Sequence, residues 1–275
     1  MSKIKLSLCQ MNVVDNKKIN LDKAKLMIEK SIKNNADFII LPEMFNCPYS
    51  NEKFIEYCEE EHDSVTLNTI SKLADANNVY ILAGSIPEKE NDNLYNTSYL
   101  FNKNGEVIGK HRKMHLFDIN VKDKITFKES DVLTAGDNVT VVDTEFGKIG
   151  IGICYDVRFV ELARLMVEKG ALILIYPGAF NMTTGPAHWE LLFRSRALDN
   201  QVFCVGVAPA LNENMSYHSY GHSIITNPWG ETIVQGDENE NLFICEIDLD
   251  EIKKVREEIP LLKNKRNDLY KIIRR

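Results

Sequence analysis

One cysteine stands where an apolar run gives way to a helical pattern. Cys154 ends the run KIGIGIC, and apolar residues then recur at helical spacing at Val157, Leu162, Leu165 and Met166. A thiol at such a bend faces a substrate together with the next backbone N–H, and a nearby helix start favours the thiolate. Free cysteines are also commonly buried and inert. Cys154 is therefore either a nucleophile or a core thiol, and its neighbours must decide.

A basic segment offers the cation that such a nucleophile needs. GKHRKMHLFD, residues 109–118, gathers three cations and two histidines and then turns apolar. A charge run is usually a solvated face, but a lysine at the edge of an interior can stabilise an oxyanion. Glu129, in the downstream stretch KITFKES, is able to hold such a lysine. On spacing alone, however, a surface charge is the favoured interpretation of Glu129.

The chain repeats part of itself in the same order. The matched pairs are LPEMFN (41–46) with YPGAFN (176–181), VYILAGSIP (79–87) with VFCVGVAP (202–209), and SYLFNKNGEVI (98–108) with SIITNPWGETI (223–233). Three ordered matches predict two similar halves, each built as helix, strand, helix, strand and hairpin.

The repeat singles out one carboxylate. Glu43 follows the apolar run FIILP and aligns with Gly178 in the second half, so the fold itself does not require a carboxylate there. Ligands bind at the carboxyl ends of strands in open α/β sheets. Glu43 is thus either a functional acid–base group or a structural ion-pair partner.

The elements that position these residues follow from local patterns. Helices are predicted from an Asn20 N-cap to about Ile32, over Leu67–Ala74, from Gly185-Pro186 to about Asn200, and from an Asp248 cap to about Ile259. Strands such as FIILP and LILIYP are apolar throughout, which requires cover on both faces. We expect an α/β fold, a four-layer α-β-β-α sandwich of two mixed sheets. A single doubly wound sheet is the alternative, which the repeated hairpins disfavour.

Composition excludes several classes of protein. The chain has 275 residues, 44% of them hydrophobic, and a net charge of −7, which argues against nucleic-acid or membrane-surface binding. It contains no run of about 20 apolar residues. The N-terminal MSKIKLSL alternates like a strand and is too short in its apolar part for a signal peptide. A cytoplasmic protein is expected.

Metal and nucleotide cofactors are not indicated. The six cysteines include no CxxC pair, so neither a zinc site nor a redox dithiol is predicted. His111 and His115 lie four residues apart, but HRKMH lacks the glutamate of a zinc-protease helix. The glycines of GKIGIGIC lie within a strand rather than after one, which disfavours a dinucleotide loop.

Three of these stretches together resemble a known family. LPEMF, KHRKMHLFD and GICYDVRF occur in the order seen in the nitrilase superfamily of carbon–nitrogen hydrolases, and the resemblance runs from about Lys3 to Tyr270. The chain looks most like the omega-amidases, through HLFDINVKDKITFKES, YPGAFNMTTGPAHWELLFRSRALDNQ, GHSIITNPWGE and KKVREEIPLLKNKRNDLY.

The resemblance implies a set of catalytic residues. Glu43 takes the position of the base, Lys113 that of the lysine, Cys154 that of the nucleophile and Glu129 that of a supporting carboxylate. Members of the family share the α-β-β-α sandwich, need no cofactor and usually form homodimers. We therefore expect one hydrolase domain over 3–248, with a C-terminal helix and tail over 249–275 packed on that domain or on a dimer partner.

Five residues are predicted to bind the substrate: Tyr49, Phe117, Tyr155, Arg158 and Asn181. Arg158 lies one helical turn after Cys154, and a guanidinium binds a carboxylate through two parallel hydrogen bonds. By analogy with related carbamoylases, it would hold the substrate's far carboxylate. Pairing with Asp156 or Glu161 within the protein is the equal alternative.

The implied activity is hydrolysis of the terminal amide of a small dicarboxylic acid monoamide, such as 2-oxoglutaramate or 2-oxosuccinamate, through a thioester. Lys122-Asp123 replaces the Pro-Gly that omega-amidases commonly carry, which leaves fine specificity open. Alternatives are deaminated glutathione or an N-carbamoyl amino acid as substrate, an amidase that supplies ammonia to a synthetase, and a catalytically inactive binding protein.

Overall fold

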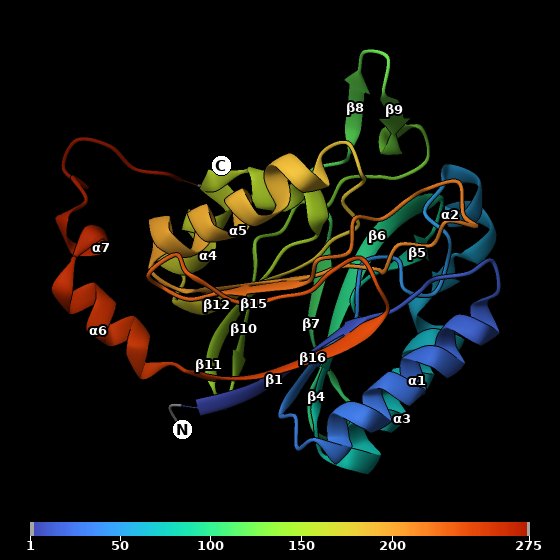
Figure 1. The fold of residues 1–275 in the computed structure, drawn as a ribbon, viewed down its shortest axis with the longest axis horizontal. Coiled ribbons are helices and arrows are strands. Elements are labelled where there is room, and N and C mark those ends of the chain that lie inside the picture. Colours follow the sequence, from blue (N-terminus) through green and yellow to red (C-terminus); the bar gives the residue numbers. More distant parts are fainter. Residues whose placement is uncertain (1–2, 274–275) are drawn as a thin grey trace.

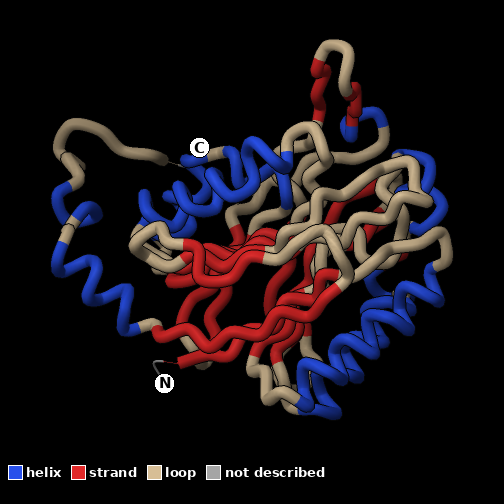
Figure 2. The backbone as a smooth tube through the Cα atoms, in the orientation of Figure 1, coloured by secondary structure: helices blue, strands red, loops and turns tan. Residues whose placement is uncertain are grey.

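Two β-sheets lie face to face, and helices cover the outer side of each (Figure 1). The computed structural model describes residues 3–273, so residues 274 and 275 of the predicted tail lie outside the described range. Figure 2 shows the strands gathered between two helical layers. The predicted four-layer α-β-β-α sandwich is confirmed.

The strands form two large sheets and one hairpin. The first sheet contains β16 (Asn241–Asp248), β1 (Lys3–Gln10), β2 (Phe38–Ile40), β4 (Tyr80–Leu82), β6 (Asn93–Phe101), β5 (Ile86–Glu90) and β3 (Glu59–Glu60), with β7 (Val107–Arg112) also paired to β6. The second contains β10 (Thr140–Thr144), β11 (Gly147–Ile151), β12 (Ala171–Pro177), β13 (Phe203–Val207), β14 (Ile224–Thr226) and β15 (Thr232–Gln235). The separate hairpin joins β8 (Asp118–Val121) and β9 (Ile125–Lys128).

The helices complete the layers. They are α1 (Lys17–Lys33), α2 (Asn51–Tyr57), α3 (Val65–Asn77), α4 (Val160–Glu168), α5 (Gly185–Asn200), α6 (Asp250–Glu258) and α7 (Leu261–Asn264). Short 3₁₀ helices are η1 (Glu61–Asp63), η2 (Glu129–Asp131) and η3 (Cys154–Arg158). Within residues 3–273 none of the helices has the length and apolar character needed to cross a membrane.

The repeat predicted from the sequence is visible in the strand pairing. In the first sheet β1, β2 and β4 are parallel, and β6 and β7 follow antiparallel. In the second, β11, β12 and β13 are parallel, and β14 and β15 follow antiparallel. The two halves therefore share one topology, and their matched strands β2 and β12 end in LPEMFN and YPGAFN.

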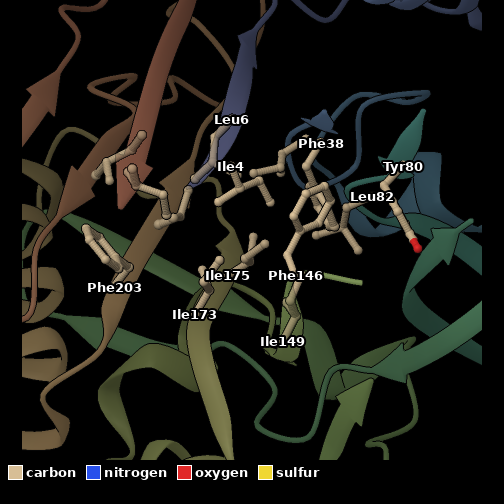
Figure 3. Close-up of a cluster of buried hydrophobic side chains, with 14 of the residues drawn as sticks. Ile4, Leu6, Phe38, Tyr80, Leu82, Phe146, Ile149, Ile173, Ile175 and Phe203 are labelled. Atoms are coloured by element: carbon tan, nitrogen blue, oxygen red, sulfur yellow. The ribbon is translucent and has the colours of Figure 1, made fainter. Parts of the chain in front are cut away.

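The core lies between the sheets, and alternation along each strand divides its side chains between two layers. Phe38 and Ile40 of β2 face the second sheet, where they join Ile173 and Ile175 of β12 (Figure 3). Ile39, between them, packs instead under α1 and α3. Full burial of each such side chain contributes about 1.5–3 kcal/mol. This double burial explains why these strands are apolar throughout.

One predicted helix start is wrong. Asn16, not Asn20, caps α1: its backbone is extended, and its Oδ1 accepts the Ile19 amide at 3.0 Å. Asn20 is buried within the helix, where its side chain accepts the Val14 amide and donates to the Val14 carbonyl. The Asn20 side chain therefore holds the loop that precedes α1, and it does not cap the helix.

The other predicted helices are present. α3 contains the predicted Leu67–Ala74, and α5 runs over the predicted Gly185–Asn200 with proline in its first turn. The helix predicted after Asp248 begins at Asp250, whose amide donates to Asp248 Oδ1 at 3.0 Å. This helix, α6, packs on its own chain, since Ile252 belongs to the core between the sheets.

A tight backbone contact holds the turn that follows β2. Ser85 forms two hydrogen bonds with this turn. Its amide donates to the Pro42 carbonyl at 3.3 Å, and its Oγ accepts the Met44 amide at 3.1 Å. The preceding residue, Gly84, has φ +27, and an added Cβ there would lie 1.9 Å from the Pro42 carbonyl oxygen. Only glycine allows this approach.

We expect Gly84→Ala to lower the free energy of unfolding by at least about 2 kcal/mol, because it combines a strained φ with a backbone collision. Urea unfolding measures this loss. Gly170→Ala is the matched control, since Gly170 also has positive φ but its added Cβ would approach only the Lys148 side chain, at 3.2 Å. Equal unfolding midpoints for the two variants would contradict the collision argument.

Candidate active site

Four polar residues predicted from the sequence meet at one end of the sandwich. Glu43 follows β2, Lys113 follows β7, Glu129 opens η2 after the β8–β9 hairpin, and Cys154 opens η3 after β11. The first three are fully buried, and Cys154 is 4% exposed. The surface interpretation of Glu129 is therefore wrong, because this carboxylate lies inside the protein.

Lys113 lies between the two carboxylates. Its Nζ donates to Glu43 Oε1 at 3.0 Å and to Glu129 Oε1 at 2.9 Å, and it lies 3.3 Å from the Tyr49 hydroxyl. Burial opposes the ammonium charge, but the charges of Glu129 and Glu43 outweigh burial and hold the pKa of Lys113 well above its usual value. Lys113 is thus a permanent cation at the centre of the site.

The two oxygens of Glu43 have different surroundings. Oε1 accepts from Lys113 and from Asn96 Nδ2, the latter at 2.8 Å. Oε2 accepts one backbone amide, that of Ala179, at 2.7 Å. Ala179 follows Gly178, the counterpart of Glu43 in the second half. The matched strand ends of the two halves therefore meet across the site, and Oε2 keeps the capacity to take a proton.

Glu129 is held by donors on three sides. Oε1 accepts the Tyr49 hydroxyl at 2.6 Å and the Lys113 ammonium, and Oε2 accepts the Phe117 amide at 2.7 Å. Burial raises the pKa of Glu129, against the opposing charge of Lys113. Phe117 also packs its ring against Tyr155 at 5.3 Å between centroids. Tyr49 and Phe117 therefore both hold Glu129 in place, one through its hydroxyl and the other through its backbone amide.

Cys154 adopts a strained backbone. Its φ of +48 lies in the left-handed region, which non-glycine residues rarely adopt outside functional turns. Gly178 makes room for it, since a Cβ on Gly178 would lie 3.3 Å from Cys154 Cα. Burial and the Glu43 carboxylate raise the pKa of the Cys154 thiol well above its usual value, although Lys113 opposes them. The thiol is therefore protonated at rest and needs a base.

The two histidines considered for a metal serve another purpose. His111 Nε2 lies 3.0 Å from Asp156 Oδ2, and His115 Nδ1 lies 2.7 Å from Asp156 Oδ1. Among residues 3–273 no group of three or more histidine, cysteine or acidic side chains is arranged to hold a metal ion. Asp156 is fully buried, and spacing along the sequence did not reveal its role.

Arg158 does not pair with Asp156 or Glu161. Its Nη1 lies 3.1 Å from His188 Nδ1, and its guanidinium lies over the ring of Phe180. Within the described residues it forms no ion pair with a carboxylate, and its Nε is buried without a hydrogen-bond partner. Burial lowers the pKa of Arg158 below its usual value. A cation beside the nucleophile thus lacks an anionic partner in the part of the chain that the structure describes.

Asn181 has a structural contact that the sequence did not reveal. Its Oδ1 accepts the amides of Thr183 and Thr184, both at 2.9 Å, in the turn that precedes α5. Its Nδ2 is buried without a hydrogen-bond partner among the described residues. The amide oxygen therefore shapes the turn, and only the nitrogen is left for a substrate.

A small cavity of ≈ 30 Å³ lies beside Glu43, large enough for a water molecule. Tyr49, Tyr217 and Ser219 are among the residues that line it. Tyr217 stacks on Tyr49 at 4.5 Å between ring centroids and donates to the Ala179 carbonyl. Tyr217 comes from the loop after β13, and no motif in the sequence indicated that this loop reaches the site.

We expect Lys113→Met to cost about 3–5 kcal/mol of stability, because it leaves two buried carboxylates without their cation. The pKa of Glu129, already raised by burial, should rise further. A carboxyl whose folded pKa exceeds its unfolded value of about 4.3 stabilises the fold below that value and loses this contribution as pH rises. Urea unfolding should therefore show a larger deficit near about pH 8 than near about pH 5.

The double variant Lys113→Met/Glu129→Gln is the matched control for this prediction. Removing one of the two carboxylates should restore part of the lost stability and flatten its pH dependence. A deficit of the same size at both pH values would show that the loss arises from packing and not from charge.

Comparisons with known proteins agree with this geometry. The family model of the carbon-nitrogen hydrolases matches residues 5–257. The omega-amidase NIT2 of Xenopus tropicalis is 46% identical over 272 residues, which cover 99% of this chain and 98% of the frog protein. Nitrilase homolog 2 of Dictyostelium discoideum is 50% identical over 260 residues, covering 94% of this chain and 79% of that protein.

A solved structure supports the same assignment. Saccharomyces cerevisiae Nit3, a member of branch 10 of the nitrilase superfamily, has a TM-score of 0.89 and 41% identity, with 96% of this chain and 97% of the yeast chain covered. The fold, the duplicated topology and the full-length similarity lead to one conclusion. This chain belongs to the carbon-nitrogen hydrolase family.

Proposed function

We propose that the protein is an omega-amidase, which hydrolyses the terminal amide of a small dicarboxylic acid monoamide to the acid and ammonia. 2-Oxoglutaramate and 2-oxosuccinamate are the substrates we favour. The observation that carries the proposal is the buried Lys113 ammonium held between Glu43 and Glu129, close enough to Cys154 to affect its thiol. Relatives named omega-amidase support the substrate class.

Acylation begins with the protonated thiol of Cys154. Glu43 Oε2 takes the thiol proton as sulfur attacks the amide carbon, since Oε1 is already occupied by Lys113 and Asn96. The oxyanion is met by the Lys113 ammonium and by the Tyr155 amide, which lies at the start of η3 and so has no partner within that helix. The C–N bond then breaks and Glu43 returns the proton to nitrogen. Ammonia departs, and the acyl group remains on Cys154 as a thioester.

Deacylation reuses the same groups. Glu43 takes a proton from water as the water oxygen attacks the thioester carbon, and the same two donors stabilise the second oxyanion. The C–S bond breaks, the acid is released, and the proton on Glu43 returns to the sulfur. Glu129 holds Lys113 in place through both steps. Each oxyanion donor is worth about 10²–10³ in rate.

Arg158 is the residue we propose for the substrate's far carboxylate. It is a cation near Cys154 that lacks a carboxylate partner among the described residues, and its guanidinium is steadied by the ring of Phe180 at 4.7 Å. A protein with net charge −7 needs such a local cation to bind an anionic amide. A planar guanidinium provides it with two parallel hydrogen bonds.

The direct test is ammonia release from a panel of amides: 2-oxoglutaramate, 2-oxosuccinamate, glutamine, asparagine and deaminated glutathione. We expect the two oxo acid amides to give the highest kcat/KM. A preference for deaminated glutathione would replace the proposed substrate. Turnover of glutamine only with a copurified synthetase would instead indicate an ammonia-supplying subunit.

We expect Glu43→Gln to block acylation, because the buried thiol of Cys154 loses its base; general acid–base catalysis is worth about 10²–10⁴ per step. Intact-mass spectrometry after mixing with 2-oxoglutaramate should show no acyl-enzyme in this variant. Glu129→Gln is the comparison and should accumulate a slowly hydrolysed thioester. Cys154→Ala should remain folded without turnover, and rapid acylation of Glu43→Gln would exclude Glu43 as the first base.

We expect Arg158→Lys and Arg158→Leu to weaken the binding of 2-oxoglutaramate by about 1.5–3 kcal/mol, the contribution of a hydrogen bond to a charged group. A neutral linear amide of similar size should be affected little, and the ratio of kcat/KM for the two amides measures the difference. Arg164→Leu is a matched control, since Arg164 lies on the next helix and donates to the Asp199 carbonyl. Equal losses on charged and neutral amides would return Arg158 to a structural role.

On sequence grounds alone we also propose a cytoplasmic homodimer. The division into a hydrolase domain over 3–248 and a tail over 249–275 has the same basis.

A further inference from the structure

The nucleophile and the oxyanion-binding lysine come from different sheets. Cys154 follows β11 of the second sheet, whereas Lys113 follows β7 of the first. The Lys113 amide donates to the Asn96 carbonyl of the first sheet at 2.8 Å, whereas Cys154 lies in a turn with the strained φ of +48. Productive attack requires the sulfur and the ammonium to face the same carbonyl group, so something must fix the two segments against each other.

Asp156 makes that connection. Its Oδ2 accepts the Ile153 amide at 2.9 Å, directly before the nucleophile, and lies 3.0 Å from His111 Nε2. Its Oδ1 accepts the His115 amide at 3.0 Å and lies 2.7 Å from His115 Nδ1. The two histidines lie two residues before and two residues after Lys113. One buried carboxylate thus joins the cysteine turn to both sides of the lysine.

We propose that Asp156 is a positioning residue that fixes Cys154 against Lys113 through His111 and His115. The proposal rests on the proposed function, since it takes Cys154 as the nucleophile and Lys113 as the oxyanion donor. Asp156 acts through these residues and not through the substrate.

Asp156, His111 and His115 together are called the brace, and further contacts hold its two histidine rings in place. His111 is fully buried, and its second ring nitrogen lies 3.0 Å from Thr140 Oγ1 of β10. The ring of His115 stacks at 3.5 Å between centroids on Phe159, the C-cap residue directly after η3. The brace therefore links β7, β10 and both ends of η3. Burial alone would raise the pKa of Asp156, but the bonds from His111 and His115 hold it well below its usual range.

A carboxylate is the only common side chain that suits this place. All four contacts come from groups that can donate, and each oxygen faces one backbone amide and one histidine. An asparagine offers one oxygen and one NH₂ group. A histidine can change tautomer to accept from that NH₂ group, but the backbone amide of Ile153 or His115 cannot. Asp156→Asn must therefore leave one buried backbone N–H facing another donor.

The test separates positioning from stability with paired variants. Asp156→Asn, His111→Leu and His115→Leu remove bonds of the brace. His111→Gln and His115→Asn restore a donor nitrogen near the position of His111 Nε2 or His115 Nδ1. Asp37→Asn is the stability control, because Asp37 accepts the Lys5 amide at 2.8 Å at the far end of β2. Every variant is assayed for kcat and KM on 2-oxoglutaramate and for its melting temperature.

A second readout does not depend on the substrate. Peptide mass spectrometry follows the alkylation of Cys154 by iodoacetamide, with the half-buried Cys58 as internal reference. Without the brace, Lys113 no longer favours the Cys154 thiolate, so alkylation of Cys154 should slow while that of Cys58 does not change. If wild-type protein hydrolyses none of the amides, the proposed function fails, whereas the alkylation rates still test the brace.

The expected result is a loss of about 100-fold in kcat for Asp156→Asn, with KM little changed, since a displacement of about 1 Å has effects of this size. His111→Gln and His115→Asn should recover most of the activity that the leucine variants lose. Asp37→Asn should lower the melting temperature without lowering kcat. A folded Asp156→Asn protein with wild-type kcat and Cys154 alkylation would overturn the proposal, as would glutamine and asparagine variants no better than leucine.

Discussion

The structure of the site depends on one buried ammonium shared by two carboxylates. Lys113, Glu43 and Glu129 are all fully buried, so their charges cannot be screened by water. One cation does not neutralise two anions, and the remaining charge is offset by fixed donors, which are the Tyr49 hydroxyl, the Asn96 side chain and the amides of Phe117 and Ala179. Each donor comes from a different segment, so the ion cluster specifies where the surrounding loops lie.

The duplicated topology explains how these segments meet. The matched strands β2 and β12 end at the same edge of the sandwich, with Glu43 after one and Gly178 after the other. The first half supplies the carboxylate, and the second supplies a backbone amide to it and the space that Cys154 needs. Met44 and Cys154, which lie beside the reacting groups, are two of the non-glycine residues with positive φ, so part of the backbone strain lies at the site.

Much of the fold could be predicted from the sequence because its signals are local. Strands that are apolar throughout required cover on both faces, and two similar hairpins disfavoured a single doubly wound sheet. The start of α1 was predicted wrongly because Asn16 and Asn20 are both capable caps, and only the path of the preceding loop decides between them. The burial of Glu129 was not predicted either, because a carboxylate in a charged stretch is normally interpreted as a surface residue.

The sequence by itself determined which reactive groups exist and which strand ends carry them, because both follow from residue type and short-range periodicity. Only the tertiary structure decided the pairing. Among residues 3–273 Arg158 has no carboxylate partner, while Asp156 bonds to two histidines. Glu43 is held by Asn96 and Ala179, which are 53 and 136 residues away. Such bonds form between segments that the packing of two sheets brings together, and no local pattern encodes the partner at that separation.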